Sequence, residues 1–186
     1  MNAPIDITNV ILHTGRLTLR PFQQADLDDF YEYASVDGVG QMCGWKPHEN
    51  KEITQSILNL FIEGKKTFAI CYNGKVIGSI GIEENKIETD DLKELKGREL
   101  GFVLSKSYWG KGLMPEAVKE VIRYLFEEVH LDYIVCGYFV WNKQSKRVQE
   151  KCGFVPQCFF ELKTSMGTTE TTQQNILMYS KWKDKE

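Results

Sequence analysis

The sequence predicts a mixed α/β fold in which residues 1–186 form one domain. The first observation is that the spacing of hydrophobic residues switches repeatedly between alternation, which is typical of strands, and a three-to-four repeat, which is typical of helices. The second is that residues 99–141 follow the order strand, crossover helix and parallel strand. The chain is long enough to bury one sizeable core, and neither a repeat nor a long linker interrupts it.

The first third of the chain predicts a strand and two helices. Leu17–Pro21 alternates as a strand, and 26–34 predicts a short helix with acidic residues in its first turn, where the helix dipole favours them. Residues 36–49 predict irregular backbone. Residues 51–63 place their apolar side chains on one helical face, and Gly64 is expected to end this helix.

A hairpin follows the second helix. Thr67–Tyr72 and 75–82 alternate as strands on either side of Asn73-Gly74, a pair that tolerates the positive φ of a two-residue turn. The acidic and lysine-rich stretch 83–97 is expected to be a mobile loop or a solvated extension of a strand.

The second half of the chain begins with the crossover unit. Residues 99–104 form a short apolar strand, 112–128 form a helix with one apolar face, and 132–141 form the next strand. The helix between the two strands allows them to lie parallel in one sheet, and the crossover is expected to be right-handed.

The remaining elements are a helix and two strands. Asn142 is a natural N-cap for a helix that runs to Lys151, and Gly153 suits the position just past its end. Strands at 159–164 and 175–182 close the chain as a hairpin over a polar turn. The prediction therefore contains about seven strands and about four helices.

Charge and composition exclude several kinds of partner. The net charge is −3 and no run of Lys or Arg is present, so we expect neither a nucleic-acid nor a membrane partner. Residues 1–10 lack the features of a signal peptide, and no apolar run approaches the ~18 residues of a membrane helix, so we expect a cytoplasmic protein. The five cysteines form no CxxC pair and no close cluster with histidine, so we expect no metal site and no disulfide framework.

The turn after the strand 99–104 carries the strongest functional signal. Trp109-Gly110-Lys111-Gly112 opens a helix, where free backbone N–H groups meet the positive end of the helix dipole. Because glycine lets the backbone approach an anion closely, residues 110–114 are candidates for holding a phosphate. The alternative is a plain strand-to-helix turn. The GxxxxGK[ST] pattern is absent, which disfavours a nucleotide P-loop.

Three segments at fixed spacing carry a family resemblance. They are Glu99-Leu-Gly-Phe-Val-Leu, Tyr108-Trp-Gly-Lys-Gly-Leu-Met-Pro-Glu-Ala and Asn142-Lys-Gln-Ser-Lys-Arg-Val-Gln-Glu-Lys-Cys-Gly-Phe. Together they resemble the GNAT superfamily of acyl-CoA-dependent N-acetyltransferases. The Arg16-Leu-Thr-Leu-Arg-Pro-Phe start resembles its Rim-type branch (RimJ/RimL), whose best known members acetylate the N-termini of ribosomal proteins. The resemblance covers nearly the whole chain and implies a twisted, mostly antiparallel sheet.

The resemblance implies acetyl-CoA as the co-substrate. The strand 99–104 is implied to diverge from the strand 132–141, so that the thioester enters a wedge between them. The chain departs from the family pattern at Ser107, where Gln or Arg is usual, and at Pro115, which removes one amide. The implied binding residues are Gly110, Lys111, Gly112, Leu113 and Met114 for the pyrophosphate, and Val103 and Leu104 for the pantetheine arm.

Acyl transfer from a thioester to an amine requires a neutral amine, a polarised carbonyl and a proton for the departing thiolate. The resemblance places a base at Glu99, acting directly or through water; the alternative is a carboxylate that merely solvates a strand end. Ser145 matches the family serine that donates a proton toward the CoA sulfur, and a local hydrogen bond is its alternative. Asn142 is expected to bond the pantetheine, to cap its helix, or both.

Three further residues are candidates for roles in the site. Tyr138 is a lesser candidate for the acid, and packing is its more ordinary role. His48 borders the acceptor side by resemblance, although an exposed loop histidine seldom does more than that. Cys152 has no adjacent histidine and lies at a helix end where thiolates are not stabilised, so we interpret it as a packing residue.

These observations predict an acetyl-CoA-dependent N-acetyltransferase that works by direct attack of a primary amine on the thioester. The acceptor is either the N-terminal amine of a protein, such as a ribosomal protein, or a small-molecule amine. A non-catalytic acyl-CoA sensor or scaffold is the alternative from another functional class. A homodimer is compatible with the family, but no feature of the sequence demonstrates one.

Overall fold

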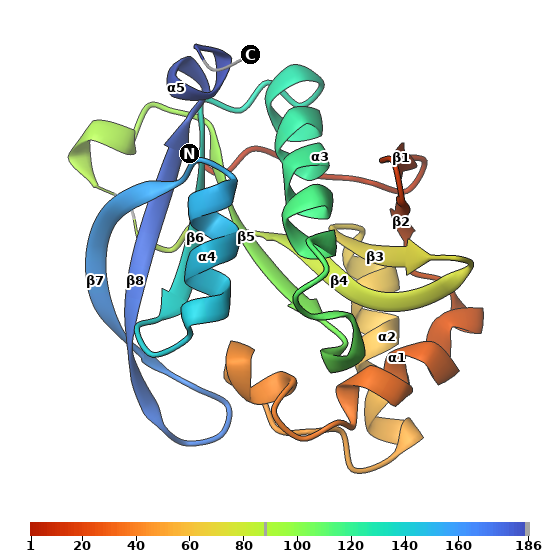
Figure 1. The fold of residues 1–186 in the computed structure, drawn as a ribbon. Coiled ribbons are helices and arrows are strands. Elements are labelled where there is room, and N and C mark those ends of the chain that lie inside the picture. Colours follow the sequence, from red (N-terminus) through yellow and green to blue (C-terminus); the bar gives the residue numbers. More distant parts are fainter. Residues whose placement is uncertain (88, 185–186) are drawn as a thin grey trace.

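The computed structural model describes residues 1–87 and 89–184, and its centre is an eight-stranded sheet with helices on both faces (Figure 1). The strand order is β1-β2-β3-β4-β5-β6-β8-β7, and all neighbouring strands are antiparallel except β5 and β6. The mixed α/β fold class and the mostly antiparallel sheet are therefore confirmed. Within the described residues, no helix combines the length and hydropathy needed to cross a membrane.

The bounds of the elements follow. The strands are β1 (Leu12–His13), β2 (Leu17–Pro21), β3 (Thr67–Tyr72), β4 (Lys75–Glu83), β5 (Gly97–Leu104), β6 (Tyr133–Phe139), β7 (Val155–Lys163) and β8 (Thr169–Met178). The helices are α1 (Leu27–Ala34), α2 (Lys51–Gly64), α3 (Leu113–Glu127), α4 (Lys143–Lys151) and α5 (Tyr179–Lys183). Short 3-10 turns are η1 (Gln24–Asp26), η2 (Gly40–Cys43), η3 (Asp90–Leu92) and η4 (Lys106–Tyr108).

The last strand differs from its prediction at both ends. Residues 179–182 were expected to continue the strand, but Tyr179 and Trp182 both lie on α5 and contact the ring of Phe126. The spacing of three between them is helical. The strand also begins earlier than expected, at Thr169, because its buried side chains are polar and so give no hydrophobic alternation.

The stretch 83–97 was expected to be a mobile loop or a solvated strand extension, and residue 88 of it lies outside the described residues. Its described part carries η3, and the side chain of Leu92 is 2% exposed. Leu92 packs with Tyr133 and Val135 of β6, so this segment covers part of the sheet.

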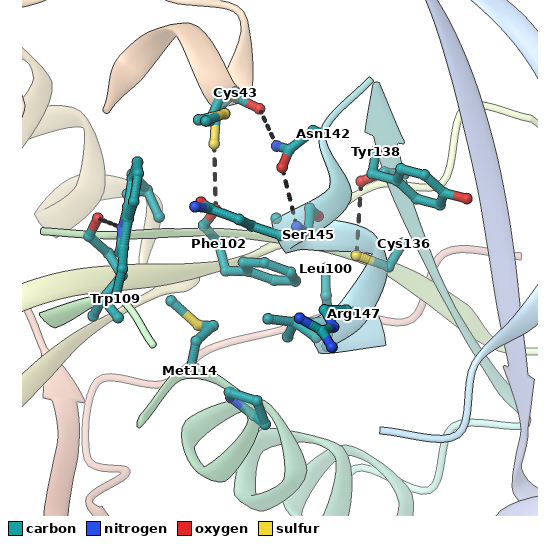
Figure 2. A pocket seen from close by; sticks show the side chains of 18 of the residues that line it. Cys43, Leu100, Phe102, Trp109, Met114, Cys136, Tyr138, Asn142, Ser145 and Arg147 are labelled. Atoms are coloured by element: carbon teal, nitrogen blue, oxygen red, sulfur yellow. Dashed lines mark hydrogen bonds between the residues drawn. The ribbon is translucent and has the colours of Figure 1, made fainter. Parts of the chain in front are cut away.

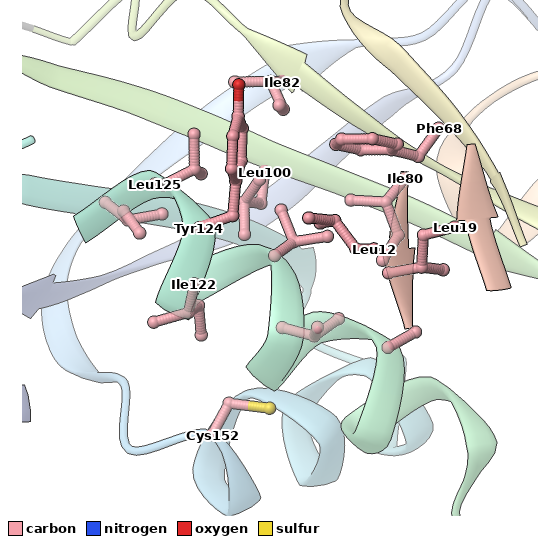
Figure 3. Packing of buried hydrophobic residues seen from close by; sticks show 14 of the residues in the cluster. Leu12, Leu19, Phe68, Ile80, Ile82, Leu100, Ile122, Tyr124, Leu125 and Cys152 are labelled. Atoms are coloured by element: carbon pink, nitrogen blue, oxygen red, sulfur yellow. The ribbon is translucent and has the colours of Figure 1, made fainter. Parts of the chain in front are cut away.

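The core divides into two layers on either side of the sheet. Apolar residues of α3 pack against strand residues such as Leu19, Phe68, Ile80 and Leu100, as Figure 3 shows. On the other face, α1 and α2 cover residues of β3 and β4, centred on Phe30 and other aromatic side chains. Each face of β3 and β4 is thereby covered by one helix layer.

The one parallel strand pair is short, and it ends where the two strands separate. β5 and β6 pair only at Gly97–Tyr133, Arg98–Ile134 and Glu99–Val135. Beyond Glu99, β5 stays paired with β4 and β6 stays paired with β8. The divergence implied by the family resemblance is thus confirmed, and the sheet opens immediately after Glu99.

Replacing Gly97 with alanine should destabilise the fold, because a Cβ there would lie 2.0–2.4 Å from the ring atoms of the buried Tyr133. Overpacking of this kind costs about 1–3 kcal/mol of unfolding free energy, measurable by urea denaturation. Gly101→Ala is the matched control on the same strand, because a Cβ there meets no atom within 4 Å. Equal stability of the two variants would contradict the packing at the β5–β6 junction.

Candidate active site

The opening between β5 and β6 is a pocket of about 540 Å³. Figure 2 shows Asn142, Ser145 and Arg147 of α4 on one side of it, and Trp109 and Met114 on the other. The structure brings nine of the ten residues predicted for the site into its walls. They are Glu99, Val103, Leu104, Gly110, Gly112, Leu113, Met114, Asn142 and Ser145.

The turn before α3 has the geometry of an anion cradle. Gly110 and Gly112 both have a left-handed backbone, with φ of 75° and 74°. Gly112 is the N-cap of α3 and has no side chain to occupy the first N–H groups of the helix. A Cβ on Gly110 would meet no atom within 4 Å, so the space in front of the turn is open. These residues fit a phosphate group.

An ion pair from the start of β2 braces this turn. The Arg16 guanidinium donates from Nη1 to the Lys111 carbonyl oxygen at 3.0 Å and from Nε to Glu116 Oε2 at 2.7 Å. Glu116 would otherwise place a negative charge beside a bound phosphate, but its carboxylate is directed to Arg16. The side chain of Lys111, the tenth predicted residue, has its Nζ 5.0 Å from the centre of the Tyr108 ring and is not part of the pocket wall.

Glu99 lies on the sheet face opposite α3, since Leu100 on the other face packs into the α3 core. Burial raises the pKa of its carboxyl group above the ordinary value of 4.5, Lys86 partly offsets this, and Glu83 adds to it. A carboxylate with a raised pKa holds a proton more readily near neutral pH, which suits a base.

Ser145 belongs to a buried network of polar side chains. Gln149, which is fully buried, donates from Nε2 to Ser145 Oγ at 3.3 Å and to the Gly137 carbonyl oxygen at 3.2 Å. Its Oε1 accepts from Asn175 Nδ2 at 2.9 Å. Within the described residues, the bond from Gln149 is the one contact of the Ser145 hydroxyl, so its proton is free to point into the pocket.

Both ends of the Asn142 amide are used within the protein. Its Oδ1 accepts from the Ser145 N–H at 3.1 Å, which confirms the predicted N-cap of α4. Its Nδ2 donates to the Met42 carbonyl oxygen at 3.2 Å. Asn142 therefore holds the helix start and a neighbouring segment together.

That neighbouring segment, residues 39–44, crosses the opening and is called the strap below. Its Val39, Met42 and Cys43 line the pocket. It is tied to β5, to α4 and to the turn after β7. The bonds are Cys43 Sγ to the Phe102 carbonyl oxygen (3.3 Å), Asn142 Nδ2 to the Met42 carbonyl oxygen (3.2 Å) and Ser165 Oγ to the Gly44 carbonyl oxygen (2.9 Å).

The backbone of β5 presents alternate residues to the opening. The Ser105 N–H bonds to the Ile77 carbonyl oxygen on β4, and in an antiparallel ladder every second residue bonds in this way. Val103 therefore directs its backbone groups to β4, whereas Phe102 and Leu104 direct theirs to the opening. The Leu104 carbonyl oxygen already accepts from the Trp109 indole at 2.8 Å. The Val103 backbone groups, which the family resemblance implies for the pantetheine arm, thus face β4, and those of Phe102 face the opening.

The sequence motifs did not predict two cationic residues of the pocket wall, Arg147 and Lys151. Both lie on α4 and are spaced four residues apart, which places them on one helix face. This four-residue spacing of cationic residues is the feature of the sequence that could have predicted them. Gln149 was missed as well, because nothing in a sequence marks a buried glutamine.

The three residues weighed as further candidates have different outcomes. Tyr138 lines the pocket. The His48 ring bonds Thr54 Oγ1 and is not part of the pocket wall. Cys152 is 7% exposed, and burial raises the pKa of its thiol to about 12, which confirms it as a packing residue.

Comparisons with known proteins identify the family of the chain. The family model described as "Acetyltransferase (GNAT) domain" matches residues 16–155. The uncharacterized N-acetyltransferase p20 of Bacillus licheniformis is 33% identical over 130 residues, which are 66% of this chain and 70% of the relative.

Solved structures share the fold. A GNAT-family acetyltransferase from Bacillus anthracis matches with a TM-score of 0.79 and 22% identity, over 92% of this chain and 99% of the other. Spermidine N-acetyltransferase from Vibrio cholerae, solved with CoA and spermine, matches with a TM-score of 0.72 and 20% identity, over 91% of this chain and 99% of the other. At these identities the likeness supports the fold alone.

Proposed function

Because the chain belongs to the acetyltransferase (GNAT) domain family and is an N-acetyltransferase, we propose that it transfers an acetyl group directly from acetyl-CoA to a primary amine held beside Glu99. The observation that carries this proposal is the end of the β5–β6 pairing at Glu99. One pocket then contains a carboxylate, a hydroxyl group and an anion cradle, and these are the groups that acyl transfer requires.

The residues of the pocket fit acetyl-CoA, which supplies the acetyl thioester. We assign the diphosphate to the amides of residues 110–114, with Pro115 contributing none. The backbone N–H groups of Phe102 and Leu104, whose carbonyl oxygens accept from Cys43 and Trp109, point away from β4 and are available to the amide-containing pantetheine arm. Arg147 and Lys151 supply positive charge from α4. We propose that they replace the Gln or Arg side chain that is usual in the family at the position of Ser107.

We assign Glu99 as the base that takes a proton from the acceptor ammonium, directly or through water. An α-amine titrates near about 7.7–8.0 and a lysine side chain near about 10.4, so an α-amine needs far less help to become neutral. The acceptor favoured by this argument is an α-amine, such as the N-terminus of a protein in the manner of the Rim-type branch. A small-molecule amine is the second candidate, because acyl transfer to it requires the same groups.

We assign Ser145 as the donor of a proton to the departing thiolate. Gln149 supports this role because its N–H occupies one lone pair of the serine oxygen and leaves the hydroxyl proton to be donated. Asn175 in turn fixes the orientation of the Gln149 amide. The proposal is tested by CoA thiol release from acetyl-CoA in the presence of alaninamide or a peptide with a free N-terminus.

Glu99→Gln should lower kcat about 100-fold while changing the Kd for acetyl-CoA little, because the amide cannot accept the proton. In the wild type, kcat should rise with pH through the raised pKa of Glu99, since only the deprotonated carboxylate acts as a base. Assays of CoA release across a range of pH measure kcat, and calorimetry measures the Kd for acetyl-CoA.

Glu83→Gln is the matched control for Glu99. Glu83 faces Glu99 across β4 and β5 and raises its pKa without lining the pocket, so its loss should move the acidic limb to lower pH and spare the maximal rate. An unchanged rate in Glu99→Gln would remove Glu99 from the mechanism.

Ser145→Ala should lower kcat about 10-fold or more, because a hydrogen bond to a charged group contributes about 1.5–3 kcal/mol. Gln149→Leu should reproduce part of this loss without changing the Kd for acetyl-CoA, because it removes the N–H that occupies one lone pair of the serine oxygen. Initial rates of CoA release at saturating acetyl-CoA measure kcat for these variants. Full activity of Ser145→Ala, with chemistry limiting, would refute the assignment.

Gly112→Val should weaken acetyl-CoA binding about 10-fold, because a left-handed backbone costs a side chain about 1–2 kcal/mol and the cradle must distort. Gly74→Val is the control, since Gly74 has a similar φ of 80° in a hairpin turn outside the pocket. Calorimetry should show weaker binding only for the first variant; wild-type affinity there would contradict the cradle.

A further inference from the structure

Two glycines flank the Glu99 carboxylate on the sheet face opposite α3. Gly101 lies two residues along β5 and so shares the face of Glu99. Gly137 lies across the opening on β6, where a Cβ would sit 3.8 Å from Glu99 Oε1 and 3.3 Å from Thr172 Cγ2. A Cβ on Gly101 would meet no atom within 4 Å. A side chain on Gly137 would therefore press against Thr172, whereas the missing side chain of Gly101 leaves an empty slot beside the carboxylate.

The backbone does not require glycine at either position. Neither residue has a positive φ, and both lie within strands, where glycine weakens the sheet. Glycine inside a strand commonly marks a place where a ligand approaches the backbone closely. Both glycines also line the pocket. Because the backbone does not require glycine, we explain the slot by a ligand group that enters it.

The walls around the slot are apolar. Phe139 and Leu162 line the pocket on this face of the sheet, and Val39 and Met42 of the strap line it from above. Among the described residues that line the pocket, Glu99 is the only acidic one. A substituent that enters the slot is thus surrounded mainly by hydrocarbon.

The charges around the slot suit one ammonium group and disfavour several. Glu83, the nearest second carboxylate across the ladder, is ion-paired with Lys66. Lys86 is close enough to lower the pKa of Glu99, so its charge repels further cations. A polyamine would place its second ammonium group in this apolar or positively charged surrounding.

Resting on the proposed function, we propose that Gly101 determines acceptor specificity. The slot that it leaves beside Glu99 holds an apolar substituent on the carbon that bears the acceptor amine. The substrate class is a monoamine, with an α-amine next to a compact apolar side chain as the best fit, and polyamines are excluded.

The test compares three acceptors at saturating acetyl-CoA: leucinamide, glycinamide, which lacks the apolar substituent, and spermidine. The wild type should use leucinamide with a kcat/KM about 10-fold above glycinamide, and spermidine least well. Gly101→Leu fills the slot, so its turnover of leucinamide should fall at least about 10-fold more than its turnover of glycinamide, with little change in acetyl-CoA affinity. Gly64→Leu is the control, since Gly64 also lacks a positive φ and lies outside the pocket.

Each result decides the inference. Spermidine used as well as leucinamide, equal use of leucinamide and glycinamide by the wild type, or equal loss of both in Gly101→Leu would overturn it while leaving the acetyltransferase function intact. Release of no CoA with any of the three acceptors would also overturn it. Failure of calorimetry to detect acetyl-CoA binding to the wild type would, in addition, refute the proposed function.

Discussion

The structure depends on the point where β5 and β6 stop pairing. Three residue pairs hold the only parallel junction of neighbouring strands in the described sheet, and every pocket wall is arranged around its end. An interrupted ladder leaves backbone groups without strand partners, which is costly if they are buried. Here the Cys43 thiol and the Trp109 indole bond the carbonyl oxygens of Phe102 and Leu104. The strap and the glycine turn therefore compensate for the opening as well as enclosing it.

The same opening imposes a cost on Glu99. Because burial raises its pKa, the folded chain binds this proton more tightly than the unfolded chain does. The contribution of Glu99 to the stability of the fold therefore falls as pH rises from its ordinary pKa of 4.5 through the raised value. At a pH above the raised pKa, the buried ionised carboxylate lowers the free energy of unfolding. A base that works near neutral pH has to accept this cost.

Much of the fold followed from local sequence, and the exceptions have a common physical origin. The Asn73-Gly74 hairpin and the Asn142 cap are decided by residues adjacent in sequence, and both were predicted. The start of β8 was missed because Gln173, Gln174 and Asn175 are buried polar residues. Their amides bond to other strands and to α4, and such partners are distant in sequence.

The candidate site likewise has residues that a local motif predicts and residues that only the tertiary structure reveals. A motif located the glycine turn and Ser145, since phosphate binding by amides and helix capping are local properties. It could not say which strand residues face the opening, because that depends on the register between β4 and β5. Nor could it find the strap, which reaches the pocket from residues 39–44 through contacts with β5, α4 and the turn after β7.

The positive charge of the cradle illustrates how tertiary contacts reassign a motif. Lys111 stands between the two glycines, yet its ammonium group lies over the Tyr108 ring. Arg16, almost a hundred residues earlier, bonds the Lys111 carbonyl oxygen and draws the Glu116 carboxylate toward itself. Because Glu116 lies in the first turn of α3, its position decides whether the helix N-terminus attracts or repels a phosphate. The affinity of the cradle for an anion therefore depends on Arg16, which immediately precedes β2, as much as on the glycine turn.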